Sequence, residues 1–150
     1  MVACLLFASS TFTTQLAAGT RTAGAVITAT VNGSDFRAEG TEISAVYMQS
    51  GNTLEIVAMP DNGEAINLTL ELKPGNTGTY NFRKGGGVAS LSYTDSDGNV
   101  FLNLSSGKVT ITNYGDGRIS GRFETEVANF SNQSRSVRNG SFRQVKYVKY

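Results

Sequence analysis

The chain has 150 residues and a net charge of +1, and this length is enough for one domain to bury a core without disulfides or metal. It contains no His and a single Cys, which excludes His-dependent catalytic triads, the usual catalytic zinc sites and an internal disulfide framework. Seventeen Gly and only two Pro, with many Ser, Thr and Asn, are typical of short strands joined by tight turns. We therefore expect an all-β, non-enzymatic protein without a cofactor.

Residues 1–24 are predicted to be the remnant of a signal peptide and a flexible lead-in. Residues 2–8 form an apolar run far shorter than the roughly 20 residues that span a bilayer, and residues 9–24 are rich in Ser, Thr, Ala and Gly. Cys4 is either the lipidated first residue of a mature lipoprotein or part of a signal that is removed. In both cases the protein is exported to the cell envelope, in the periplasm or on the outer surface, or secreted, and it meets a membrane only through a lipid anchor. A cytoplasmic protein with a frayed start is the third interpretation.

Residues 25–150 are predicted to form one domain, in which strand candidates recur about every ten residues. Ile27, Ala29 and Val31 alternate with Thr and end at Asn32-Gly33, a strong two-residue hairpin turn. Further strand candidates follow at residues 35–39, 43–48, 54–59, 65–72, 80–82, 89–93 and 100–104. Residues 105–107 are then expected to form a turn that ends this strand before the next one begins.

The clearest hairpin is predicted over residues 107–129. Val109 and Ile111 alternate with Thr, and we expect residues 113–117 to form the turn. Apolar residues and a glycine then alternate with polar residues, which places one set on the inner face: Ile119, Gly121, Phe123 and Val127. Gly121 on that face would let a neighbouring ring or backbone come close.

The last 24 residues carry all of the excess positive charge. Residues 1–126 have 8 basic and 12 acidic groups, whereas residues 127–150 have five basic groups and no acid. Asn139-Gly140 is expected to separate two strands in this region. The cations could meet phospholipid, acidic polysaccharide or nucleic acid. We favour a terminal edge strand that Lys and Arg protect from aggregation, and nucleic acid is not an expected partner.

The pattern as a whole predicts ten or eleven strands in a single antiparallel meander that closes into a β-barrel, with a two-sheet β-sandwich as the alternative. A small barrel either holds one ligand or is filled by its own side chains. We expect its interior to bind a small apolar or amphipathic ligand, or a glycan. The lining residues would be Phe36, Ile56, Leu68, Tyr80, Leu91, Ile111 and Phe123. The alternative function is a structural or interaction module at the cell surface, which joins an envelope protein through strand edges or through strands that are apolar on both faces.

Two acidic patterns are candidates for chemical sites. Residues 95–99 resemble half of a calcium loop, but the remaining ligands are missing and the Asp-Gly pair favours a hairpin turn. Glu124 and Glu126 could serve as a glycosidase pair, but the alternation predicts that both lie on a solvated outer face. We therefore predict no catalytic and no metal-binding residue.

The body of the chain resembles an uncharacterised family of small all-β secreted proteins and lipoproteins of Bacteroidota. The similarity is carried by strand and turn residues at 28–33, 36, 78–80, 107–112, 119–123 and 139–142. The resemblance implies a lipocalin-like or calycin-like barrel in the cell envelope, and it implies no reaction. The sequence around Cys4 departs from the lipoprotein members, because apolar residues follow it.

Overall fold

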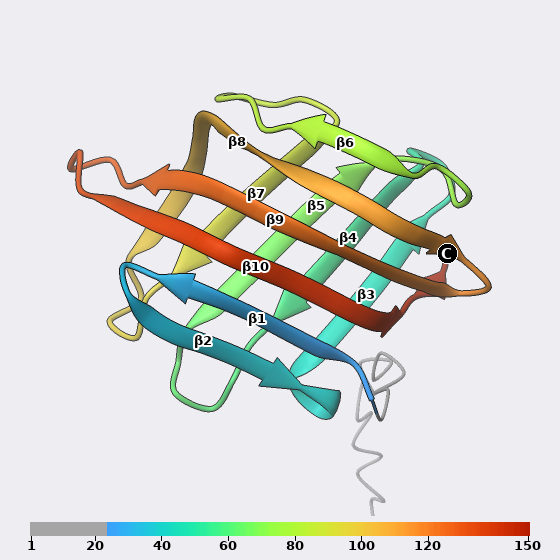
Figure 1. Ribbon diagram of the computed structural model, residues 1–150, viewed down its shortest axis with the longest axis horizontal. Coiled ribbons are helices and arrows are strands. Elements are labelled where there is room, and N and C mark those ends of the chain that lie inside the picture. Colours follow the sequence, from blue (N-terminus) through green and yellow to red (C-terminus); the bar gives the residue numbers. More distant parts are fainter. Residues whose placement is uncertain (1–23) are drawn as a thin grey trace, which may run out of the picture.

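Residues 24–150 are described by the computed structural model, and they form a single strongly curled sheet, an open half-barrel (Figure 1). The strands are β1 (Val26–Val31), β2 (Ser34–Glu39), β3 (Ile43–Met48), β4 (Thr53–Ala58), β5 (Ala65–Glu71), β6 (Gly78–Asn81), β7 (Ala89–Thr94), β8 (Val100–Gly115), β9 (Arg118–Ala128), β10 (Ser134–Lys146) and β11 (Val148–Lys149). A short 3-10 helix, η1 (Gly40–Glu42), links β2 to β3. The predicted all-β, barrel-like fold is confirmed.

The sheet follows the order β11-β3-β4-β5-β7-β8-β9-β10-β1-β2, and β6 pairs with β8 beside this path. All pairs are antiparallel except β11 with β3. In Figure 1, β8, β9, β10, β1 and β2 lie in front of β3, β4, β5 and β7 and cross them steeply. The curl stays open because its two end strands, β2 and β11, are not hydrogen-bonded neighbours in the sheet.

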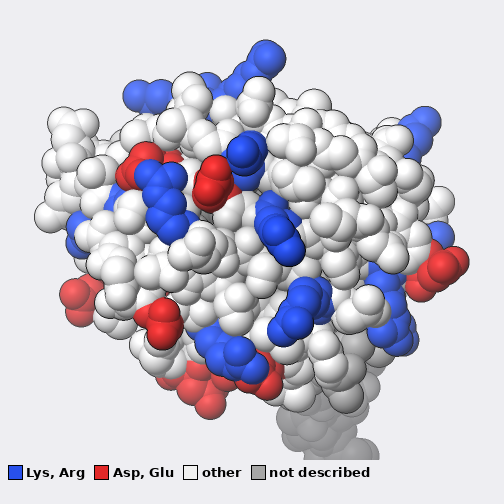
Figure 2. All heavy atoms as spheres, viewed as in Figure 1, with Lys and Arg blue, Asp and Glu red and all other residues white. Residues whose placement is uncertain are grey.

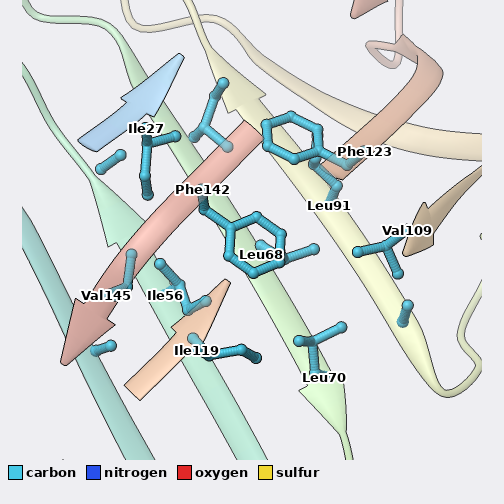
Figure 3. Close-up of a cluster of buried hydrophobic side chains, with 14 of the residues drawn as sticks. Ile27, Ile56, Leu68, Leu70, Leu91, Val109, Ile119, Phe123, Phe142 and Val145 are labelled. Atoms are coloured by element: carbon cyan, nitrogen blue, oxygen red, sulfur yellow. The ribbon is translucent and has the colours of Figure 1, made fainter. Parts of the chain in front are cut away.

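Apolar side chains from both layers fill the space between them. Leu68 and Leu70 of β5 and Leu91 of β7 meet Ile119 of β9 and Phe142 of β10 in one buried cluster (Figure 3). This arrangement follows from the period-two alternation of each strand, which directs every second side chain inward. The hydrophobic burial of these residues is the main force that holds the two layers together.

The turn predicted at Asn32-Gly33 forms as expected, and the second hairpin turns at Asp116-Gly117, within the predicted residues 113–117. Asn32 and Gly33 have φ values of 50° and 85°, and Asp116 and Gly117 have values of 52° and 71°. Two successive positive φ angles define the type I′ turn, which matches the twist of the flanking strands. The alternation in β9 is also confirmed, since Ile119, Gly121, Phe123 and Val127 are buried.

The expected break at residues 105–107 is wrong, because β8 runs through them as one bent strand of 16 residues. Its first part pairs with β7 in the rear layer and with the end of β9, and its second part pairs with β6 and the rest of β9 in the front layer. Gly107 has a φ of 102° at the bend, and the buried Thr125 hydroxyl donates to the Ser106 carbonyl at 2.6 Å. The predicted turn at 113–117 is too long, because β8 continues to Gly115. Tyr114 is a buried strand residue whose hydroxyl donates to the Leu72 carbonyl.

The expected turn at Asn139-Gly140 is also wrong, because β10 continues through it with a bulge. Asn139 does have a positive φ of 51°, as a turn residue would, but the chain pairs with β9 on both sides of it. The expected terminal edge strand is confirmed for β11 and wrong for β10. β10 lies between β9 and β1, and of the C-terminal residues only the two-residue β11 lies at the end of the sheet.

Candidate functional site

The residues predicted to line a binding cavity come together as the packed core of the half-barrel. Phe36, Ile56, Leu68, Leu91, Ile111 and Phe123 are at most 4% exposed, and Tyr80 is half-buried against them. The hollows described below open on the outer surface instead. Cys4 and the rest of residues 1–23 lie outside the described part of the chain, so the export and lipidation predictions stay predictions.

Two adjoining hollows lie on the outer face of β8, β9 and β10, and we call them together the outer groove. The first hollow, of about 430 Å³, is lined by Lys108, Thr110, Arg122, Phe123, Glu124, Asn139, Gly140 and Ser141. The second, of about 530 Å³, is lined by Thr112, Ser120, Gly121, Arg122, Ser141, Phe142, Arg143 and Gln144. Arg122 and Ser141, which face each other across β9 and β10, border both hollows.

Each hollow lies beside one bulge of β10. The register between β9 and β10 shifts after Val137 and again after Phe142, so that two residues of β10 face one residue of β9 each time. Asn139 and Gln144 belong to these bulges and have φ values of 51° and 53°. A bulge bends its strand and redirects a side chain, and here it brings an amide side chain to the rim of each hollow.

A glycine and a phenylalanine pair beneath each hollow. Gly140 pairs with Phe123, and Gly121 pairs with Phe142. A Cβ atom placed on Gly140 would lie 2.5 Å from the Phe123 ring, and one placed on Gly121 would lie 2.5 Å from Cζ of Phe142. The two rings stack with centroids 6.2 Å apart. The rings are buried on the inner side of the sheet. The floor of the groove is therefore formed by the main chain of these residues.

Charged side chains of both signs lie on this outer face, with several Lys and Arg across its middle (Figure 2). Three of these cations already have acidic partners on the same face. Lys108 lies 3.7 Å from Glu124, Arg138 pairs with Glu126, and Arg37 pairs with Glu39. Exposed pairs of this kind contribute only about 0–1 kcal/mol to stability.

Arg122 and Arg143 differ from those cations. Within residues 24–150, neither forms an ion pair or a side-chain hydrogen bond. Both are exposed and border the second hollow, whose lining contains no acidic residue. The second hollow is therefore the more positive part of the outer groove.

The two acidic patterns have structural roles. The Asp95 carboxylate accepts hydrogen bonds from the backbone N–H groups of Asp97 and Asn99 and from the Asn99 side chain, and these bonds lower the pKa of Asp95. Glu124 and Glu126 lie on the outer face in the ion pairs described above. Among residues 24–150, no group of three or more His, Cys, Asp or Glu side chains is placed to hold a metal ion.

A separate, apolar hollow of about 560 Å³ lies outside the outer groove, where β8 begins and β9 ends. It is lined in part by Leu102, Leu104 and Phe130. Phe130 is 94% exposed. Within its loop, the Asn129 side-chain oxygen accepts hydrogen bonds from the N–H groups of Ser131 and Gln133.

Sequence reasoning predicted which of these residues point outward but missed the groove. Thr110 and Arg122 alternate with inner residues, and this signal was available. The residues of β10 could not be placed in the same way, because the two bulges interrupt the alternation. Their juxtaposition with Arg122 depends on the register of β9 and β10, which no local pattern specifies.

Within residues 24–150, no helix has the length and apolar character needed to cross a bilayer. No curated protein and no solved structure was found to match the chain. The model of one protein family, described as a domain of unknown function (DUF6252), matches residues 23–146. This match covers the entire half-barrel except its last residues, and the chain therefore belongs to the DUF6252 family.

Proposed function

We propose that the protein is an exported, non-enzymatic binding module that holds a glycan in the outer groove. The observation that carries this proposal is the pair of adjoining hollows over the two bulges of β10. Export rests on the character of residues 1–24, and a role without catalysis rests on the absence of His from the chain.

The size of the hollows suits sugar units. Ligand sites usually have volumes of about 300–1,000 Å³, and the two hollows measure about 430 and 530 Å³. Both are open and adjoining, so an extended chain could occupy them without entering the domain. The packed inner face leaves the predicted interior residues to a structural role, and we place the ligand outside.

The lining of the groove favours a polar ligand over an apolar one. Thr110, Asn139 and Ser141 border the first hollow, and Thr112, Ser120 and Gln144 border the second. Hydroxyl and amide groups donate and accept hydrogen bonds, as the hydroxyl groups of sugars require. Hydrogen bonds to neighbouring strands orient two of these hydroxyls. The Thr110 and Thr79 hydroxyl oxygens are 2.9 Å apart, and so are those of Ser141 and Thr28.

A glycan array probed with the full chain tests this proposal. We expect the wild-type protein to retain at least one glycan, and Thr110→Tyr, which fills the first hollow, to weaken that binding at least tenfold. Thr69→Tyr is the matched control, because Thr69 lies on the outer face of β5 in the other layer. Absence of binding to any glycan, or equal binding by the two variants, would contradict the proposal.

A second candidate function, an interaction module, is favoured by Phe130. A fully exposed phenylalanine in a hydrogen-bonded loop beside an apolar hollow is typical of a contact site for another protein. If this site joins an envelope protein, Phe130→Ser should abolish a complex isolated with the wild-type chain from the native envelope. Tyr150→Ser, at an exposed residue away from the hollow, should leave that complex intact.

A further inference from the structure

We infer that the ligand of the outer groove is an anionic glycan, whose acidic group lies in the second hollow between Arg122 and Arg143. This inference rests on the proposed function and specifies the chemistry of the ligand. It is carried by the different charges of the two adjoining hollows.

The two hollows differ in the charge of their linings. The first contains Lys108 and Glu124, which are 3.7 Å apart and largely neutralise each other. The second contains Arg122 and Arg143 and no acid. Arg122 borders both hollows, so the lining of the second carries two positive charges and that of the first a net charge of one. A carboxylate or sulfate would therefore be stabilised more in the second hollow, whereas the first offers hydrogen bonds to a neutral sugar.

The two arginines are available for an anion. The guanidinium group is planar and presents its N–H donors in a fork that matches a carboxylate or sulfate in bidentate fashion. Arg122 and Arg143 have no acidic partner within residues 24–150, so a ligand would not have to displace an existing ion pair. Ser120 and Gln144 lie beside them, and the hydrogen bond from the Gln144 N–H to the Ser120 hydroxyl oxygen, at 2.9 Å, fixes the bulge that positions Arg143.

The positions of Arg122 and Ser141 link the two hollows into one site. Both residues border each hollow, so a chain that lies across them would place adjacent sugar units on either side of this pair. The floor is main chain and lies below the side chains of the rim. The site therefore suits a chain in which an acidic sugar is next to a unit with free hydroxyl groups.

The same face is poorly suited to nucleic acid. Proteins that bind single strands stack the bases on exposed aromatic rings, and the only rings that line the outer groove, Phe123 and Phe142, are buried on the inner side. A glycan that is held through its hydroxyl and acidic groups does not need exposed rings.

Calorimetric titration of the full chain tests the inference. The probes are a hexasaccharide in which glucuronate alternates with neutral N-acetylglucosamine, the same oligosaccharide with its carboxyl groups reduced to alcohols, and a single-stranded DNA of equal charge. We expect the acidic oligosaccharide to bind at least tenfold more tightly than its reduced form. Arg122→Gln and Arg143→Gln should each weaken its binding at least tenfold, because each removes charge-assisted hydrogen bonds. Neither should change binding of the reduced form more than threefold.

Arg138→Gln is the matched control, since it removes the same charge from β10 outside the groove lining, and it should change affinity for the acidic oligosaccharide less than threefold. Equal binding of the acidic and reduced forms would overturn the inference and leave the proposed function standing. Tighter binding of the DNA would overturn it in favour of nucleic acid. Failure of the array and of both oligosaccharides to show binding would instead reject the proposed function itself.

Discussion

The ring of Phe142 lies directly against Gly121 on the neighbouring strand, so that a Cβ atom on Gly121 would sit 2.5 Å from Cζ of the ring. The same Cβ would collide with the main-chain carbonyl of Thr110 on the other side. Gly121 is thus held between β8 and β10 by contacts that leave no room for a side chain. This close approach supports the floor of the second hollow.

Gly121→Ala should lower the free energy of unfolding by about 2–3 kcal/mol, because overpacking a rigid core forces neighbouring groups to move. Gly115→Ala is the control: a Cβ there meets nothing within 4 Å, and we expect a change below about 0.5 kcal/mol. Urea denaturation followed by circular dichroism measures both. Equal effects of the two substitutions would show that the contact with Phe142 is not restrictive.

Gly107→Ala should be more harmful, with a loss of about 4 kcal/mol or an unfolded protein, because it combines a positive φ with a collision. A Cβ there would overlap the Glu124 carbonyl and lie 2.6 Å from Cα of Thr125. Gly98→Ala separates the two causes, since Gly98 has a φ of 84° but open surroundings, and it should cost about 1–2 kcal/mol. Thermal unfolding of the two variants, compared side by side, measures the difference. A larger loss at Gly98 would contradict the bend that we describe in β8.

Tyr114→Phe should destabilise the fold by about 1–2 kcal/mol, because it leaves the buried Leu72 carbonyl without the hydroxyl that donates to it at 3.1 Å. Tyr147 packs against the same ring at a centroid distance of 5.5 Å, and its hydroxyl makes no hydrogen bond within residues 24–150. Tyr147→Phe should therefore change stability by less than about 0.5 kcal/mol. Chemical denaturation distinguishes the two variants, and the reverse order would refute this assignment.

Stability should decrease at alkaline pH. Burial raises the pKa of Tyr93, as do its hydrogen bond to Glu64 and the charge of that carboxylate, and burial is also the main cause that raises the pKa of Tyr114. A pKa raised in the folded state adds stability below the unfolded value of about 10, and this stability is lost as the pH rises above it.

Urea midpoints measured between about pH 8 and pH 11 test this dependence. They should stay level until about pH 9–10 and then fall. A variant with Tyr93→Phe and Tyr114→Phe should start less stable and show a shallower decline. An equally steep decline in that variant would assign the pH dependence to other groups.

The sequence alone determined the fold class and which side of most strands is buried. Alternation in residues 119–127 has a period of two because the pleat directs successive side chains to opposite faces. Asn32-Gly33 and Asp116-Gly117 were likewise predictable, because few other residues accept two successive positive φ angles.

The tertiary structure alone decided what the remaining turn signals do. Asn139 has the φ angle of a turn residue, yet its strand continues, because β9 and β1 pair with β10 beyond the bulge. A local sequence specifies a backbone angle, whereas the partners on either side decide whether the chain reverses or bulges. The outer groove depends on the same pairing. Arg122 and Arg143 line one hollow only because of the register between β9 and β10. The residue pattern of either strand alone does not specify this register.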